Sequence, residues 1–130
     1  MHLTRLPDDD GLVRVQCSGK ILQYLLQPGT HPLEKAVGPE VFKYRVLFDL
    51  SATEFIDTSG IAWMLGCHKR FNAYGGRIVF HSAPPIVDQP LSVLNMDKVL
   101  LLALDEPQAR RMANAAEEAE ARRIMKEGRP

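Results

Sequence analysis

The feature that most constrains the fold is a short, nearly continuous apolar run, Val46–Leu50, which is bounded by polar and turn-forming residues. A run so short and so apolar is typical of a β-strand that is buried on both faces of a sheet. The segments "RIVFHS" at 77–82 and "KVLLLAL" at 98–104 have the same character. Strands of this kind belong mainly to parallel sheets, whose strands need crossover connections.

Helical patterns lie between these strands. We expect a helix over Ser59–Tyr74 that ends at Gly75-Gly76, and another over Ile86–Met96. The segment "PLEKAVGPEVFKY" at 32–44 predicts a short or broken helix, because Gly38-Pro39 interrupts it. Strands that alternate with helices predict one α/β domain with a mostly parallel sheet.

The N-terminal segment has a different pattern. The residues "GLVRVQCSG" at 11–19 alternate between apolar and polar and predict a strand. A second short strand at Leu3–Leu6 would pair with it across "PDDDG", because Asp10-Gly11 suits a tight hairpin. The predicted sheet is therefore mixed. The stretch "ILQYLLQPGTHP" at 21–32 is ambiguous.

Length and composition fit a single globular domain, because the chain has 130 residues and 45% of them are hydrophobic. Sixteen basic residues balance sixteen acidic ones, which argues against direct binding to nucleic acid or to an anionic membrane. No apolar stretch approaches the roughly 20 residues that span a bilayer, and the N-terminus lacks a signal-peptide layout. Cys17 and Cys67 do not make a disulfide framework. We therefore expect a cytoplasmic protein.

The last segment, "EPQARRMANAAEEAEARRIMKEG" at 106–128, is rich in strong helix formers. Its apolar stripe is thin, so three arrangements stay open: the helix docks on the domain, pairs with a second copy, or stays solvated. We treat residues 1–106 as the domain and residues 107–130 as a helical extension of the same domain.

The helix predicted over Ser59–Tyr74 has two different faces. At about 100° per residue, one face is apolar and should pack on the sheet, with Ile61, Met64, Leu65, His68 and Phe71. The opposite face carries Ser59, Trp63, Gly66, Cys67 and Arg70. Trp63 either folds onto a neighbouring loop or anchors an interface with a partner. Ser59 either caps the helix or accepts a phosphate beside the unpaired N–H groups of the first turn.

Enzymatic, metal and phosphate-loop chemistry find no support in the sequence. A serine hydrolase would need a base near Ser59, but His68 lies on the opposite helix face. His81 ends a predicted strand, and no G-x-S-x-G elbow is present. The adjacent Cys67 and His68 point about 100° apart, and no second pair completes a zinc site. Gly75-Gly76 lacks the spacing of a phosphate-binding loop. We therefore expect no catalytic residue, cofactor or metal.

These segments together resemble the STAS domain family of anti-sigma-factor antagonists. The resemblance rests on an apolar strand followed by Asp57-Thr58-Ser59-Gly60, a helix, the "GGRIVF" strand and a helix before a final strand. The earlier "VRVQCSGKI" at 13–21 is similar to the opening strand of the family and its Ser-Gly turn. The resemblance covers about residues 10–106. It implies a small mixed, mostly parallel sheet of four or five strands with packed helices.

The resemblance also implies a function. Antagonists of this family bind an anti-sigma factor that is also a serine kinase; the kinase phosphorylates the serine before the glycine, binding is lost, and a phosphatase restores it. Carried onto this chain, the phosphorylation site is Ser59, with Thr58 as the second choice. The partner-binding surface would comprise Asp57, Thr58, Ser59, Gly60, Trp63, Gly66, Cys67 and Arg70. A homodimer is also left open.

The chain departs from the family pattern at one position. Many antagonists carry an Asp soon after the first Ser-Gly, and Leu22 stands at that place here. Two functions therefore stay open. The chain is either a non-enzymatic switch of transcription regulation, or a structural adaptor of a transporter or signalling assembly that needs no phosphate.

Overall fold

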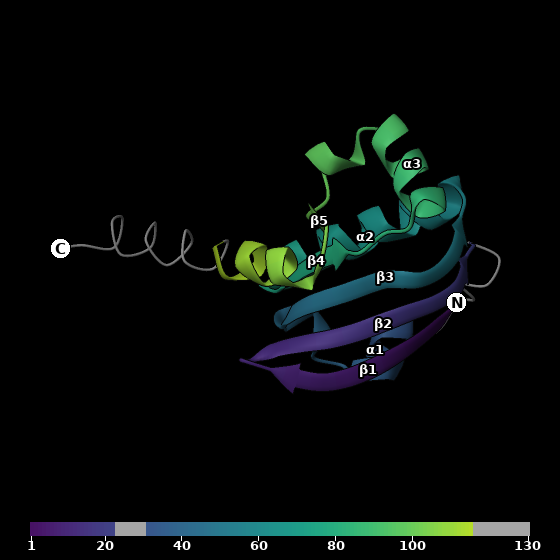
Figure 1. The fold of residues 1–130 in the computed structure, drawn as a ribbon. Coiled ribbons are helices and arrows are strands. Elements are labelled where there is room, and N and C mark those ends of the chain that lie inside the picture. Colours follow the sequence, from purple (N-terminus) through teal and green to yellow (C-terminus); the bar gives the residue numbers. More distant parts are fainter. Residues whose placement is uncertain (23–30, 116–130) are drawn as a thin grey trace.

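The computed structural model describes residues 1–22 and 31–115, and its centre is a five-stranded sheet (Figure 1). The strands are β1 (His2–Asp9), β2 (Leu12–Ile21), β3 (Arg45–Ile56), β4 (Arg77–His81) and β5 (Leu102–Ala103). They lie side by side in chain order. β1 is antiparallel to β2, and the other neighbouring pairs are parallel. The predicted mixed, mostly parallel sheet is confirmed.

The connections between the parallel strands are helical. They contain α1 (Pro32–Val37), α2 (Thr58–Tyr74) and α3 (Pro85–Val93), and two 3-10 turns, η2 (Val41–Lys43) and η3 (Met96–Lys98). Because each crossover leads to the next strand in the same direction, right-handed connections place all three helices on one face of the sheet. Residues 106–115 are also helical and cover the other face.

β3 supplies side chains to both faces, as its apolar sequence predicts. Val46, Phe48 and Leu50 belong to the core under the three helices. Leu47 lies on the opposite face and belongs to the second cluster, together with Ala109 and Ala113 of the C-terminal helix. Successive residues of a strand point to opposite faces, so one strand joins both layers of the fold.

The N-terminal hairpin forms as predicted, with longer strands. Asp10 has φ 51° and Gly11 has φ 74°, and two successive positive φ angles are the signature of a type I′ turn. Asp9 pairs with Leu12 directly across this turn. The twist of this turn type matches the twist of the two strands, which explains why an Asp-Gly pair stands here.

The described part of the C-terminal helix, residues 106–115, docks on the sheet. Glu106 accepts a hydrogen bond from Arg14 at 2.6 Å, and Arg110 donates one to Asp9 at 2.6 Å. Ala109 and Ala113 are buried. The small side chains pack against Leu12, Leu47 and Val79 of the sheet, and the ion pairs connect the helix to β1 and β2. Residues 116–130 lie outside the described residues.

Two predicted boundaries near the C-terminus are wrong. The strand predicted over 98–104 contains only Leu102–Ala103, and the helix predicted over Ile86–Met96 ends at Val93. Asn95 adopts a left-handed conformation with φ 55°, which ends the helical path and starts η3. The apolar run at 98–104 therefore forms only a two-residue strand, because its first residues belong to the turn that brings the chain back to the sheet edge.

A close approach of backbone at Gly76 gives a first prediction. A methyl group on residue 76 would overlap the Phe42 carbonyl oxygen and lie 2.6 Å from the Tyr44 oxygen, so Gly76→Ala should destabilise the fold by about 1–3 kcal/mol. Gly66→Ala is the matched control, because a methyl group there meets open space inside α2. The control should be stabilising by roughly 0.5–1 kcal/mol. Urea unfolding measures both; equal effects would contradict the close contact.

Candidate functional site

The start of α2 carries the predicted phosphorylation site, and Asp57 caps it. The Asp57 carboxylate accepts a hydrogen bond from the Gly60 N–H at 2.7 Å, and helix α2 begins at Thr58. Ser59 is therefore the second residue of the helix, and the predicted helix start at Ser59 is one residue late. Since Asp57 makes the capping bond, the Ser59 hydroxyl is not required for it. Ser59 is partly exposed and Thr58 is exposed.

The end of β2 packs against this turn. A side chain on residue 60 would overlap the Ile21 carbonyl oxygen and come within 2.8 Å of Ile56 Cγ1, which explains the glycine. Gly60 is buried, so it shapes the site and offers a partner no side chain. Leu22 follows Ile21 directly and is 8% exposed. The position at which the family often has a carboxylate is thus an almost buried aliphatic side chain.

The sequence did not single out two exposed side chains near the ends of β2 and β3. Lys20 and Phe55 are paired across β2 and β3, one residue before the pair Ile21 and Ile56 that touches the turn. Lys20 is exposed, and the Phe55 side chain is 41% exposed. The alternation of β3 carries the signal: Ile56 points inward, so Phe55 must point outward. An aromatic and a basic side chain therefore lie at the same strand ends, on the sheet face that points away from α2.

Helix α2 is rotated relative to the predicted faces. Its buried residues are Gly60, Ile61, Met64, Cys67 and Phe71. Cys67 is 1% exposed and is therefore a core residue. The prediction that it lies on the partner-binding surface is wrong. His68, predicted in the core, is partly exposed and lies 3.2 Å from the Asn72 amide nitrogen. Gly66 is exposed, as predicted.

The segment from His31 to Lys43 causes this rotation, because it packs on the flank of α2. The Trp63 ring is stacked on the His31 ring at 5.6 Å between centroids, and it is partly buried. The Arg70 guanidinium lies over the Phe42 ring, 4.7 Å from its centroid. Trp63 therefore does fold onto a neighbouring segment, one of the two alternatives in the sequence. Arg70 remains exposed.

His31 holds several of these contacts together. Its Nδ1 accepts a hydrogen bond from the Leu33 N–H at 3.1 Å and so caps α1. Its Nε2 lies 3.7 Å from Cys67 Sγ. Burial, and to a smaller extent the positive charge of Arg70, lowers the pKa of His31 to about 4. The neutral ring is required, because a protonated Nδ1 could not accept the capping bond.

Other reactive chemistry is not assembled in the described part of the chain. Burial raises the pKa of both thiols, Cys17 and Cys67, which disfavours a reactive thiolate. The His81 ring lies 2.8 Å from the Ser82 hydroxyl. Among residues 1–22 and 31–115, no three His, Cys, Asp or Glu side chains are placed to hold a metal ion. No helix within these residues has the length and hydropathy that a membrane crossing needs.

Comparison with protein-family models assigns this arrangement to a family. The model of the STAS domain matches residues 19–109, which is more than half of the chain. The chain belongs to the STAS domain family. The Ser59 turn, the Gly75-Gly76 pair and strands β3, β4 and β5 lie within the matched residues, whereas β1 and most of β2 precede them. No curated protein matches the sequence of this STAS domain.

Solved structures share the fold of this STAS domain. An anti-sigma factor antagonist from Mycobacterium paratuberculosis is 25% identical, with a TM-score of 0.64 over 86% of this chain and 94% of that one. The unphosphorylated anti-sigma factor antagonist SpoIIAA is 14% identical, with a TM-score of 0.62 over 87% and 96%. The murine anion transporter Slc26a9 is 13% identical, with a TM-score of 0.68 over 88% of this chain and 22% of that one. The same fold thus serves antagonists and a transporter.

The low pKa of His31 gives a second prediction. The unfolded chain binds this proton near pH 6.5 and the folded domain near pH 4, so stability should fall as the pH is lowered through this range. With an allowance for screening of the partly exposed ring, His31→Gln should remove about 1 kcal/mol of the loss between pH 7 and pH 5. His2→Gln is the control, because His2 is exposed on β1. Urea unfolding of the wild type and both variants at each pH measures the free energy of unfolding. The same dependence of this free energy on pH in all three proteins would contradict the role of His31.

Proposed function

We propose that this STAS domain is a cytoplasmic, non-enzymatic binding protein that antagonises an anti-sigma factor and is switched by phosphorylation of Ser59. The observation that carries the proposal is that Asp57, and not Ser59, caps helix α2. The partly exposed Ser59 hydroxyl is therefore not needed for the capping hydrogen bond. The likeness to solved antagonists supports the class of partner.

The exposed surface around Ser59 fits a protein partner. Thr58 offers an exposed hydroxyl on this turn, and the partly exposed Trp63 offers an aromatic ring one helical turn further along α2. Exposed aromatic side chains contribute strongly to protein interfaces, because they bury a large area at low entropic cost. The proposed contact surface comprises Asp57, Thr58, Ser59, Gly66, Arg70 and the part of Trp63 that its stack on His31 leaves exposed. Cys67 is left out because it is buried.

A phosphate on Ser59 would change this turn electrostatically. The N-terminus of a helix attracts anions, which favours the phosphorylated form. However, the Gly60 N–H is already bound by Asp57 at 2.7 Å, and the Asp57 carboxylate repels a phosphate dianion. The phosphate and Asp57 would therefore compete for the first turn of α2. Either the cap loosens or the phosphate projects outward, and both outcomes alter the surface that a partner contacts.

Leu22 is compatible with this switch and changes its electrostatic setting. An aliphatic residue replaces a carboxylate near the acceptor serine, so the turn has one negative charge fewer. A phosphate then meets less repulsion than it would beside two carboxylates. Because Leu22 is 8% exposed, it contributes packing more than contact surface. We infer that the kinase recognises the exposed side chains of the turn and not a carboxylate at position 22.

The third prediction tests phosphorylation and binding together. With a serine kinase of the anti-sigma type and ATP, phosphate should appear on Ser59 of the wild type and be lost in Ser59→Ala, as mapped by mass spectrometry. Thr58→Ala is the matched control and should keep the label. Ser59→Asp should weaken binding of the same partner more than a hundredfold, which corresponds to about 3 kcal/mol, while unfolding is little changed. A cognate phosphatase should restore binding of the phosphorylated protein.

A structural adaptor is the alternative function, and Leu22 is the observation that favours it. If the missing carboxylate means that no kinase acts here, the domain binds its partner permanently through its surfaces. Ser59→Asp would then leave partner binding unchanged, and no label would appear on Ser59. Both results together would replace the switch by the adaptor.

A further inference from the structure

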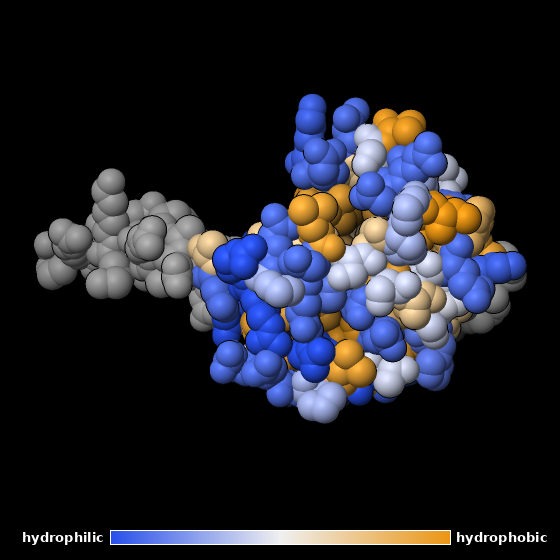
Figure 2. Space-filling model, in the orientation of Figure 1, coloured by the Kyte–Doolittle hydropathy of each residue, from blue (hydrophilic) through white to orange (hydrophobic). Residues whose placement is uncertain are grey.

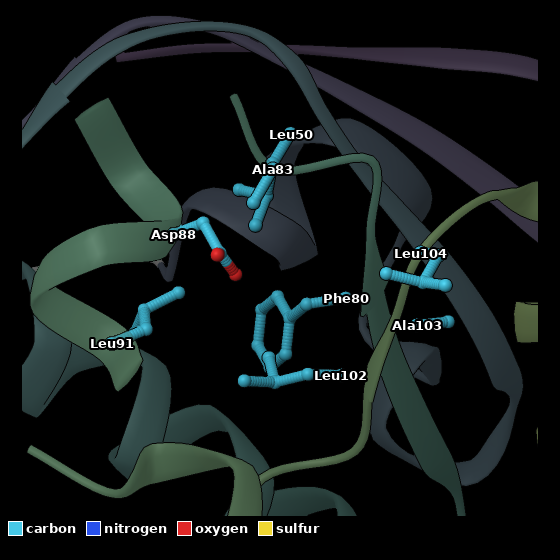
Figure 3. A pocket seen from close by; sticks show the side chains of 8 residues that line it. All are labelled: Leu50, Phe80, Ala83, Asp88, Leu91, Leu102, Ala103 and Leu104. Carbon is cyan, nitrogen blue, oxygen red and sulfur yellow. The ribbon is translucent and has the colours of Figure 1, made fainter. Parts of the chain in front are cut away.

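A small cavity lies between α3 and the edge of the sheet. Its volume is about 110 Å³, and aliphatic and aromatic side chains from β3, β4, α3 and β5 form most of its lining, including Leu50, Phe80, Leu91 and Leu102. Leu104 stands at its border, as Figure 3 shows. A cavity of about 150 Å³ holds a benzene ring, so this one has room for roughly one aliphatic side chain.

The cavity is a consequence of the local chain path. β5 contains only Leu102–Ala103, so α3 covers an edge of the sheet that ends early. Ser82 has φ 61°, and Pro84 and Pro85 start α3 immediately after the small residue Ala83. Pro90 inside α3 lacks an N–H, which weakens the helix where it passes over the cavity. These features keep α3 from sealing the sheet edge.

Leu104, which lines the cavity, is one of several exposed apolar side chains in this part of the sequence. Of the eight large hydrophobic side chains that are exposed among the described residues, five lie between positions 86 and 104: Ile86, Val93, Leu94, Val99 and Leu104. Val93 is 73% exposed and Leu104 is 85% exposed. Figure 2 shows several separate apolar patches on the visible face, with hydrophilic surface between them. Single exposed apolar residues are ordinary, but one as exposed as Leu104 at the border of an apolar cavity suits contact with a partner.

Asp88 is the one charged residue among the described residues that line the cavity, and its negative charge favours an occupant with a cation beside its apolar part. Asp88, in the first turn of α3, is exposed, and its carboxylate points toward the Phe80 ring across the opening (Figure 3). An apolar floor with a carboxylate at the mouth complements an aliphatic tip that has a cation beside it. We propose that this cavity is a docking site for a partner protein, which inserts an aliphatic side chain and pairs a neighbouring Lys or Arg with Asp88. The site shares no residue with the Ser59 turn.

Two synthetic helical peptides of equal composition test the proposal. Both are alanine-based; one carries Leu and Lys four residues apart on the same face, and the other carries them two residues apart on opposite faces. Chemical shifts of the ¹⁵N-labelled full chain are followed by NMR. The first peptide should shift the signals of Leu91, Leu102 and Leu104 and bind at least fivefold more tightly than the second. Asp88→Asn should remove this fivefold difference.

Matched variants separate docking from loss of structure. Asp97→Asn removes an exposed carboxylate of η3 that does not line the cavity, and it should preserve the preference. Leu104→Ser should weaken both peptides, whereas Val93→Ser, away from the lining, should have a smaller effect. Thermal unfolding of each variant is measured first. Asp88 lies near the positive end of the α3 dipole, so its replacement by Asn can also lower the stability of the helix.

Three results with the peptides would overturn the proposal: equal binding of both peptides, a binding preference that persists in Asp88→Asn, or chemical-shift changes confined to other surfaces. Concentration-dependent association of the chain alone, abolished by Asp88→Asn, would instead assign the cavity to a second copy and also overturn it. None of these results bears on phosphorylation of Ser59, so the two proposals fail separately.

Discussion

The end of β2 and the start of α2 meet so closely that residue 60 can carry no side chain. A methyl group there would overlap the Ile21 carbonyl oxygen, so the backbone of the two elements, and not their side chains, sets their separation. Because β2 and β3 are parallel neighbours, the same contact fixes the end of β3 relative to the helix that follows it. In this turn the Asp57 carboxylate accepts the hydrogen bond of the Gly60 N–H, and Ser59 is partly exposed. The geometry of the candidate site therefore follows from one glycine.

This arrangement separates two tasks that a serine at a helix start would otherwise share. If Ser59 were the cap, a phosphate on it would remove a capping hydrogen bond, and the free energy of unfolding would fall by about 1 kcal/mol. With Asp57 as the cap, a modified Ser59 changes mainly the charge and shape of the surface. A regulatory site benefits from such separation, because binding can then respond strongly while the stability of the domain responds weakly.

The sequence predicted the elements that depend on local pattern, and it failed where a distant segment decides. Val46–Leu50 reveals a strand buried on both faces, and Asp10-Gly11 reveals the hairpin, because each needs only its own residues. The burial of Cys67 depends on His31 and Phe42, which approach from another part of the chain. The pattern of α2 alone is compatible with two rotations, since Trp63 and Cys67 on one side compete with Leu65 and His68 on the other. Family resemblance singled out Ser59 as the candidate acceptor, which stays a prediction, whereas the Asp57 cap became visible only in the folded structure.

The two proposed surfaces have a joint consequence if one partner occupies both. Contacts held by the same rigid sheet act at a high effective concentration, so their combined affinity greatly exceeds that of either alone. Phosphate at Ser59 would then weaken one contact while the cavity beside Asp88 keeps the other. After phosphorylation the partner would stay bound through the cavity contact alone and would not be released. A switch built in this way releases its partner only if the α3 contact is weak by itself, which agrees with the small volume of the cavity, about 110 Å³, and its single carboxylate.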